Sequence, residues 1–180
     1  GKNLGAMGDA GCIVTNNDDL ADWMTLFARH GGKGDHLIEG INSRMDGIQA
    51  AILKVKLPFL KEWTIKRQIA ADYYNELLSN IKDIITPYKD DNIEHVYHLY
   101  MIKVQNRDEL KNYLRENGIP TVINYSKALP FYKAYDYLNH KREDFPNAYE
   151  NQNKILSLPI YPEIEKVQQE YIAEKIINYY

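Results

Sequence analysis

The sequence has little of what marks several large classes of protein. One cysteine in 180 residues excludes a disulfide within the chain. No apolar run approaches the roughly 20 residues that span a bilayer, and the front of the chain has no secretory signal pattern. The formal net charge is −3, with acids and bases interspersed, which argues against nucleic acid or an anionic membrane as a main partner. We therefore expect a cytoplasmic protein with a small-molecule ligand.

Two more absences concern metals and the extent of the chain. The five histidines and Cys12 show no spacing typical of metal ligands, so no bound metal is expected. Cys12 lies in an apolar stretch, and we expect it to be a buried thiol in a reducing compartment. No initiating methionine is present, and Gly1-Lys2 starts in the middle of a motif, so we expect a piece of a longer protein.

Glycine is abundant at the front, where GKNLGAMGDAG has four glycines in eleven residues. A Walker phosphate loop needs Ser or Thr after its lysine, and Asn3 stands there instead. A dinucleotide fingerprint must follow a strand and open a helix, whereas the residues after Asp9 have the pattern of a strand. What remains is Lys2 in a glycine-rich turn before a strand, which is either an exposed surface lysine or a reactive amine.

The sequence pattern of the first third of the chain predicts a clear order of secondary-structure elements. Residues 11–17 (GCIVTNN) predict a short buried strand, and Asn17 or Asp18 then caps a helix that His30-Gly31 ends. Residues 31–44 lack apolar periodicity and predict a binding loop or disorder. A helix begins at Asp46, and Pro58 either kinks it or starts a second segment that reaches Leu77. Such a long bent helix commonly bridges two domains.

The pattern changes after Ile81. Residues 85–88 (ITPY), 95–104 (HVYHLYMIKV) and 119–125 (IPTVINY) predict strands, and residues 107–118 predict a helix closed by Gly118. The two segments 128–138 and 140–149 read as loop and turn with aromatic packing, and a last helix starts near Glu165. This order favours a small α+β layer with helices on one face of a sheet.

Five blocks of sequence, in order, carry a family resemblance. They are GKNLGAMGDAG, GINSRMDGIQAAILKVKLPFL, HVYHLY, INYSKALPFYKAY and ILSLPIYPEI. Together they resemble the C-terminal half of the DegT/DnrJ/EryC1/StrS sugar aminotransferases. The resemblance implies an α/β fold of the fold-type I, aspartate aminotransferase-like class, pyridoxal 5′-phosphate (PLP) as cofactor, and a homodimer with shared active sites. It also implies that residues 1–57 end the large PLP-binding domain and that residues 58–180 form the small α+β domain.

The resemblance assigns roles to individual residues. Lys2 matches the lysine that binds the cofactor as a Schiff base and then moves the proton during transamination. Asn42 matches the asparagine that reaches the cofactor phosphate of the other subunit, and Arg44 matches a contact to the nucleotide-sugar substrate across the same interface. Tyr125 is retained in the substrate-binding INY block, but Asn124 stands where many members have histidine, which puts sugar recognition in doubt.

Each assignment has a plainer alternative. Asn42 lies in a turn-like sequence and could serve only as a turn residue. Arg44 could form an ordinary salt bridge with Asp46 or Glu39. The histidines of HVYHLY, His95 and His98, alternate with aromatic residues and are expected to pack or hydrogen-bond structurally.

The resemblance implies a reaction and a limit. Lys2 indicates amino transfer, because a related branch that dehydrates sugars carries histidine at this position. The INY block favours a dTDP-linked 3-keto-6-deoxy hexose as substrate. The family resemblance implies glutamate as amino donor and a role in deoxyamino-sugar or cell-surface polysaccharide biosynthesis. The family's aspartate that pairs with the cofactor ring nitrogen precedes Lys2, so we expect these 180 residues alone to have little activity. The alternative is a non-catalytic ligand-binding or dimerisation module.

Overall fold

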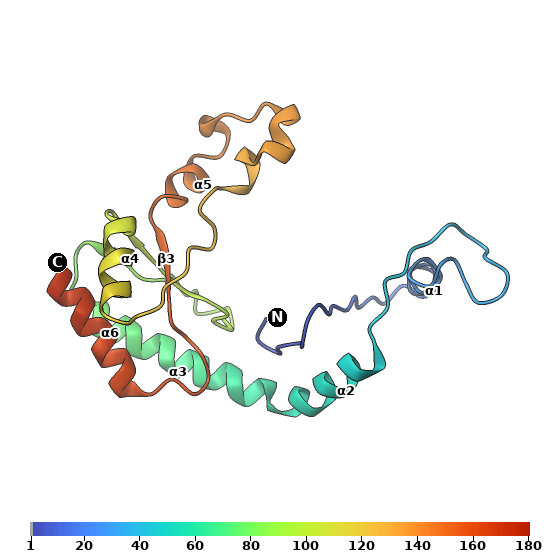
Figure 1. Ribbon diagram of the computed structural model, residues 1–180, viewed down its shortest axis with the longest axis horizontal. Helices are drawn as coiled ribbons and strands as arrows, with labels where there is room; N and C mark the ends of the chain where they lie inside the picture. Colours follow the sequence, from blue (N-terminus) through green and yellow to red (C-terminus); the bar gives the residue numbers. More distant parts are fainter. Residues whose placement is uncertain (1) are drawn as a thin grey trace. The chain divides into compact units, whose positions relative to one another are not determined.

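The structure is a computed structural model that describes residues 2–180. The chain forms two compact units, one up to Leu60 and one from Lys61 to Tyr180, and each is described by itself (Figure 1). None of the helices within residues 2–180 has the length and apolar character needed to cross a bilayer.

The first helix of the first unit, α1, spans Asp18–Phe27. The side-chain Oδ1 of Asn17 accepts a hydrogen bond from the backbone N–H of Leu20 at 2.9 Å, which confirms the predicted N-cap. The helix ends at Phe27, three residues before the predicted stop, and the chain then leaves through His30 and Gly31, both with positive φ. The C-cap is Ala28, not the predicted glycine, although the backbone N–H of Gly31 donates to the carbonyl oxygen of Leu26 in the last turn at 2.8 Å.

The helix predicted from Asp46 is interrupted around Pro58. Helix α2 spans Gly47–Lys56, a 3₁₀ turn covers Leu57–Phe59, and helix α3 runs over Leu60–Leu78. Proline has no N–H to donate to the preceding turn, which explains why the regular α-helix is interrupted there. Of the two alternatives left open for Pro58, a kink or a second segment, the structure shows a second segment, α3, after the 3₁₀ turn.

The strand predicted over residues 11–17 does not form, and the prediction of a buried Cys12 is wrong. Within residues 2–180 the backbone of residues 10–14 has no hydrogen-bonded partner, and a strand needs one. Ile13 is 75% exposed and Val14 is 89% exposed, and the Cys12 thiol is exposed beside them. The segment is apolar, but apolar composition alone does not supply a neighbouring strand.

The second unit is built on a three-stranded antiparallel sheet in the order β1-β2-β3. The strands span Ile84–Ile85, Tyr100–Val104 and Ile155–Leu158, with Ile102 opposite Leu156. Helix α4 (Arg107–Glu116) and helix α6 (Lys166–Tyr179) complete the unit with α3. The side chains that form the core come from one face of the sheet and from these helices, chiefly Tyr74, Leu78, Tyr100, Ile102, Leu110, Leu114, Leu156, Ile172 and Ile176. The expected layer with helices on one face is thus confirmed.

Three strand predictions for this unit need correction. The strand expected over residues 85–88 is present only at Ile85, because β1 ends there. Residues 119–125 form only one isolated bridge, Val122 to Ser157, and the third strand is Ile155–Leu158, which was not predicted. The strand expected over residues 95–104 begins only at Tyr100, because Tyr97 has φ +40° and turns the chain there. Burial raises the pKa of the Tyr74 and Tyr100 phenols, so both remain neutral donors in the core.

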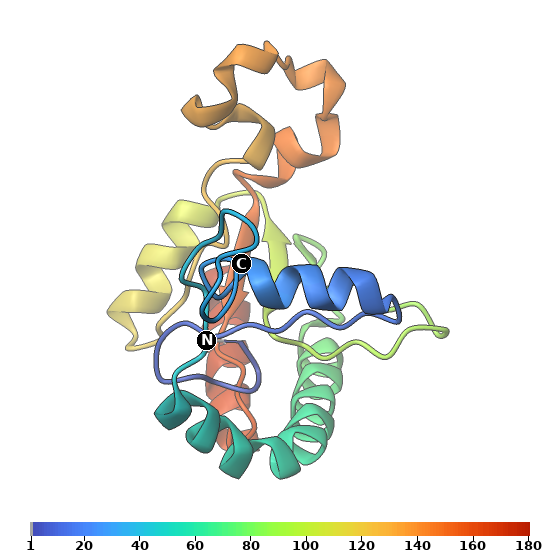
Figure 2. The ribbon, with the colours of Figure 1, turned by 90° about the vertical axis from the view of Figure 1, so that its right-hand side faces the viewer.

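Residues 126–151 extend away from the sheet in both views (Figures 1 and 2). Short 3₁₀ helices at Leu129–Phe131, Lys133–Leu138 and Arg142–Asp144 and helix α5 (Pro146–Asn151) replace the expected plain loop. The predicted aromatic packing is present, since the Phe131 ring lies 5.4 Å from that of Tyr149 and 6.5 Å from that of Phe145, edge to face.

Truncation of Leu156 tests the importance of this core. Leu156→Ala is expected to lower the free energy of unfolding by about 2–5 kcal/mol, because the fully buried side chain leaves a cavity opposite Ile102. Leu129→Ala is the control, since Leu129 is 65% exposed, and it should change stability by less than about 0.5 kcal/mol. Urea denaturation followed by circular dichroism measures both; equal losses would contradict the described core.

Candidate active site

Lys2 begins the glycine-rich segment, and its side chain is exposed. Within residues 2–180 no hydrogen bond or ion pair involves its Nζ, so the amine is open to a ligand. Two side chains of α2 hold the segment that follows. The Nζ of Lys56 donates to the carbonyl oxygen of Gly5 at 2.5 Å, and the Oε1 of Gln49 accepts from the backbone N–H of Met7 at 2.8 Å.

Asn42 and Arg44 lie at the base of the glycine-rich loop that follows α1. Residues 41–43 run alongside residues 27–30, with Ile41 donating to Phe27 at 2.8 Å and Ser43 donating to Ala28 at 3.0 Å. Arg29 and Asn42 form the bridge between the two segments. This short ladder fixes the backbone at Asn42, two residues before Arg44, although the segment belongs to no regular strand.

Two glycines allow the base of this loop to close. A Cβ on Gly31 would lie 1.7 Å from the carbonyl oxygen of Ile38, and Gly31 is itself at φ +88°. A Cβ on Gly40 would lie 2.6 Å from the carbonyl oxygen of Phe27. No larger residue fits at either position without moving the backbone, so the loop that carries Asn42 depends on glycine at both ends.

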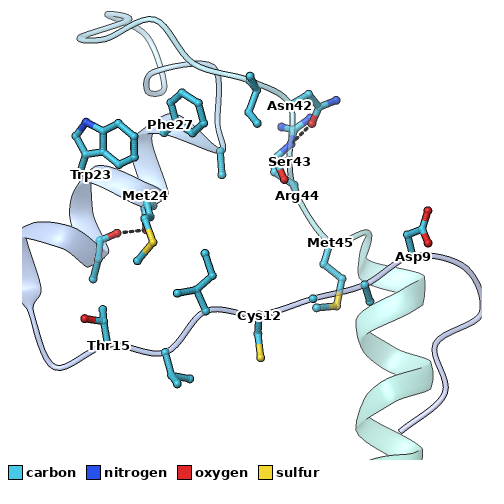
Figure 3. Close-up of a pocket in the computed structure, with 18 residues that line it drawn as sticks. Asp9, Cys12, Thr15, Trp23, Met24, Phe27, Asn42, Ser43, Arg44 and Met45 are labelled. Carbon is cyan, nitrogen blue, oxygen red and sulfur yellow. Dashed lines mark hydrogen bonds between the residues drawn. The ribbon is translucent and has the colours of Figure 1, made fainter. Parts of the chain in front are cut away.

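Asn42 and Arg44 share one pocket of about 1180 Å³ within the first unit (Figure 3). In this pocket Trp23, Met24 and Phe27 of α1 lie to one side and Cys12 lies on the segment before the helix. The Trp23 and Phe27 rings are stacked, with centroids 4.9 Å apart. The pocket therefore combines an apolar wall with polar groups at its edge.

The two polar side chains contact each other in this pocket. The Nε of Arg44 donates to the Oδ1 of Asn42 at 3.0 Å (Figure 3). Among the described residues Arg44 forms no ion pair with Asp46 or Glu39, so the structure does not contain the salt bridge that was its plainer alternative. Asn42 forms an antiparallel bridge with Arg29 rather than a turn, so the plainer alternative of a turn residue is not what the structure shows.

The other two candidate residues belong to the second unit. The Oδ1 of Asn124 accepts a hydrogen bond from the Oγ of buried Ser157 on β3 at 3.0 Å. Tyr125 is 64% exposed. Asn124 is thus tied to the sheet while the neighbouring phenol reaches solvent.

The first histidine of HVYHLY makes structural contacts. The Nδ1 of His95 accepts from the backbone N–H of Tyr97 at 2.9 Å, and its ring lies 4.1 Å from that of Tyr97. The carbonyl oxygen of His95 accepts from Gln68 of α3 at 3.1 Å. These contacts agree with the structural role expected for this residue.

Comparison with known proteins decides the family. The sequence profile of the DegT/DnrJ/EryC1/StrS aminotransferase family matches residues 1–177. The chain belongs to this family. It is 42% identical to a pleiotropic regulatory protein of Geobacillus stearothermophilus, covering 99% of this chain and 49% of that protein. It is 36% identical to the dTDP-3-amino-3,6-dideoxy-alpha-D-galactopyranose transaminase of Aneurinibacillus thermoaerophilus, covering 99% of this chain and 54% of that protein.

Solved structures of the DegT/DnrJ/EryC1/StrS family agree with the fold. The chain superposes on S. venezuelae DesV, solved in complex with a ketimine intermediate, with a TM-score of 0.93 and 31% identity over 98% of this chain and 48% of that one. A Brucella abortus aminotransferase of the family gives a TM-score of 0.92 at 34% identity over the same shares. The resemblance and the α/β fold class expected from the sequence are both confirmed. The chain spans about half the length of the curated relatives it matches.

The side chains of this family member suit the phosphate of PLP. Because the Oδ1 of Asn42 is occupied by Arg44, the amide presents its Nδ2 as a donor. The terminal guanidinium nitrogens of Arg44 have no protein partner among the described residues, and a guanidinium fork binds phosphate oxygens well. The accessible amine of Lys2 fits an aldehyde, so the donor set and the cofactor are chemically compatible.

The structure brings only part of the candidate set together. Asn42 and Arg44 are in contact, whereas Lys2 does not line their pocket and Asn124 and Tyr125 lie in the second unit. Sequence reasoning did not assign roles to Gln49 or Lys56. A signal existed in their seven-residue separation, which places both on one face of α2, but nothing in the sequence indicates what that face contacts.

Proposed function

We propose that the whole protein is a PLP-dependent aminotransferase that converts the keto group of a nucleotide-linked hexose to an amine. The substrate class proposed is a dTDP-linked 3-keto-6-deoxy hexose, with glutamate as donor, in deoxyamino-sugar or cell-surface polysaccharide biosynthesis. The observation that carries this proposal is the family match over residues 1–177 with Lys2 in the GKNLG motif. Relatives named as dTDP-amino-sugar transaminases support the substrate class.

Lys2 has the central part in this proposal. When bound, PLP supplies an aldehyde for a lysine amine and a ring that withdraws electrons from the amino donor. Lys2 holds the cofactor through its Nζ, and the same nitrogen accepts and returns the proton that transamination moves. That work needs an uncharged amine as the proton acceptor, and within residues 2–180 no carboxylate forms an ion pair with the Lys2 side chain.

Asn42 and Arg44 are proposed to bind the anionic groups of the cofactor and the substrate in the active site. Asn42 donates to the cofactor phosphate, and Arg44 binds the diphosphate of the nucleotide sugar. In the proposed homodimer both serve the partner's site, and a two-fold pair completes both sites at once. Lys2 is not among the residues that line the pocket of Asn42 and Arg44, which supports that arrangement.

Asn124 and Tyr125 are proposed to contact the sugar. The exposed Tyr125 phenol can donate to or accept from a hydroxyl, and Asn124 is held by Ser157 with its Nδ2 left to donate. We further propose a cytoplasmic protein in which residues 1–57 end the large PLP-binding domain and residues 58–180 form the small domain.

The chain by itself is proposed to have little activity. Between Lys2 and Leu60 the only buried residue is Gly31, so this unit has no hydrophobic core of its own. Ile13, Val14 and Ile48 are each at least 75% exposed, as expected of surfaces that pack against further polypeptide.

The second candidate is a non-catalytic ligand-binding or dimerisation module. The name of the G. stearothermophilus relative, a pleiotropic regulatory protein, is what favours it. Under this candidate Lys2 is an ordinary turn residue and binds no cofactor covalently.

Borohydride trapping separates the two candidates. The whole protein is mixed with PLP, reduced, digested and analysed by mass spectrometry. The proposal requires the phosphopyridoxyl label on the peptide that contains Lys2, at a stoichiometry near one per chain. Label spread over many lysines, or absent from Lys2, would support the non-catalytic candidate.

Arg44 provides a test of substrate binding. Arg44→Met in the whole protein is expected to raise KM for the nucleotide sugar by about 10- to 100-fold, because hydrogen bonds between charged groups are lost. The kcat should change by less than about threefold, because the diphosphate is bound alike before and during reaction. Arg115→Met, the same charge change at an exposed residue of α4, is the control. A fall in kcat with unchanged KM would contradict the assigned role.

A further inference from the structure

Two glycines that follow Lys2 each lie directly beneath a polar side chain of α2. Gly5 has φ +72° and Gly8 has φ +126°, conformations that other residues rarely adopt. A Cβ on Gly5 would lie 3.3 Å from the Nζ of Lys56, and a Cβ on Gly8 would lie 3.4 Å from the Nε2 of Gln49. The backbone therefore bends at each glycine where a helix side chain closes on it.

Both contacts are hydrogen bonds of the kind that fix a backbone. Lys56 brings a charged donor to the Gly5 carbonyl at 2.5 Å and is partly buried there. Gln49 accepts the Met7 N–H at 2.8 Å. The two side chains are seven residues apart, about two helical turns, and so project from the same face of α2.

We propose that Gln49 and Lys56 are positioning residues that fasten the segment after Lys2 to α2 and thereby hold the Lys2 amine in place. The inference rests on the proposed function, because it assigns these two contacts to the delivery of the reactive lysine. A segment with so many glycines has large conformational freedom. Fastening it at two points removes that freedom before the reaction begins, which is how correct placement of a reacting group raises a rate.

The chain supplies matched variants for Lys56. Lys56→Met removes the donor and keeps an unbranched side chain of similar length, and Lys56→Arg restores a charged donor. Lys54→Met is the control, because it makes the same charge change on an exposed residue of the same helix for which no hydrogen bond or ion pair is found within residues 2–180. For Gln49, Gln49→Leu removes the acceptor and Gln49→Glu keeps it.

Hydrogen exchange of the cofactor-free whole protein gives a direct structural measurement. Peptides covering residues 3–8 should exchange about tenfold faster in Gln49→Leu and Lys56→Met than in the wild type. Peptides from the core strand Tyr100–Val104 should exchange at the wild-type rate, which shows that the variant is folded. The Lys54→Met control should exchange like the wild type throughout.

Kinetics and spectroscopy then test positioning of Lys2. Lys56→Met is expected to lower kcat by about 10- to 100-fold with KM for the nucleotide sugar within about twofold, because only the placement of the amine changes. The pH midpoint of the absorption band of lysine-bound PLP should shift in Lys56→Met, and Lys56→Arg should return both values toward the wild type. Lys54→Met should leave kcat and this midpoint unchanged.

The outcomes distinguish the two proposals. If the wild-type protein is not labelled at Lys2 by borohydride, the proposed function fails. If it is labelled and Lys56→Met matches Lys54→Met in exchange, kcat and pH midpoint, the positioning role is wrong and the proposed function stands. Faster exchange with unchanged kcat and midpoint would also overturn the inference, since the contacts would then serve only the fold.

Discussion

Replacing Lys2 with alanine in the whole protein is expected to lower kcat for transamination by about 10⁴-fold or more. Its Nζ is the proposed covalent attachment point and proton carrier, and loss of general acid–base catalysis alone accounts for about 10²–10⁴. Overall stability should stay within about 0.5 kcal/mol of the wild type, because the side chain is exposed. Turnover of a dTDP-linked keto sugar with glutamate, and the Tm, measure the two effects.

The control for Lys2 is another lysine among glycines. Lys33 lies in the GGKGD stretch and is exposed, so Lys33→Ala makes the same change in a similar local sequence. It should retain more than half of wild-type turnover. Wild-type turnover in Lys2→Ala would mean that the lysine has no chemical role and would contradict the proposed function.

Replacing Gly31 with alanine is expected to cost about 3–5 kcal/mol and to abolish the function of Asn42 and Arg44. The new Cβ would meet the Ile38 carbonyl oxygen at 1.7 Å, and φ is +88°, so steric overlap and backbone strain act together. The loop base must open to relieve the overlap, and the segment that carries Asn42 moves with it. Urea denaturation, together with the KM for the nucleotide sugar, tests this result.

Substitutions at two other glycines separate the effect of steric overlap from the effect of backbone strain. Gly34 has φ +90° but nothing lies within 4 Å of its Cβ position, so Gly34→Ala measures strain alone, about 1–2 kcal/mol. Gly47 has an ordinary φ in the first turn of α2 and open space around it, so Gly47→Ala should be neutral or stabilise by up to about 1 kcal/mol. If Gly31→Ala resembles Gly34→Ala, the close approach to Ile38 is not rigid.

Local patterns in the sequence predicted the helices well. Asn17, Pro58 and Gly118 each affect the backbone of their immediate neighbours, so the start of α1, the break before α3 and the end of α4 could be read directly. The prediction of a strand in residues 11–17 was wrong, and the strand Ile155–Leu158 was not predicted. Both errors have the same cause. A strand is decided by its partner, and residues 119–125 and 155–158 are both apolar enough to pair with β2.

The candidate site could be predicted only in part, because its contacts also depend on residues that are distant in the sequence. The resemblance named Lys2, Asn42 and Arg44, but the hydrogen bond from Arg44 to Asn42 depends on side-chain directions that spacing does not give. The contacts of Gln49 and Lys56 join residues more than 40 positions apart, and the positive φ values of Gly5 and Gly8 that permit them leave no trace except glycine itself.

The first unit lacks a buried core and the second has one, and this difference affects how the measured tolerance to substitution should be interpreted. Residues 61–180 have their own core, so a polar replacement of Ile102 or Leu114 is harmful in any setting. Residues 2–60 have none, so a mutational scan of the isolated chain would score Val14 as freely replaceable. Only a scan of the whole protein can reveal selection on such side chains, and tolerance measured in the shorter chain should not be taken as neutrality.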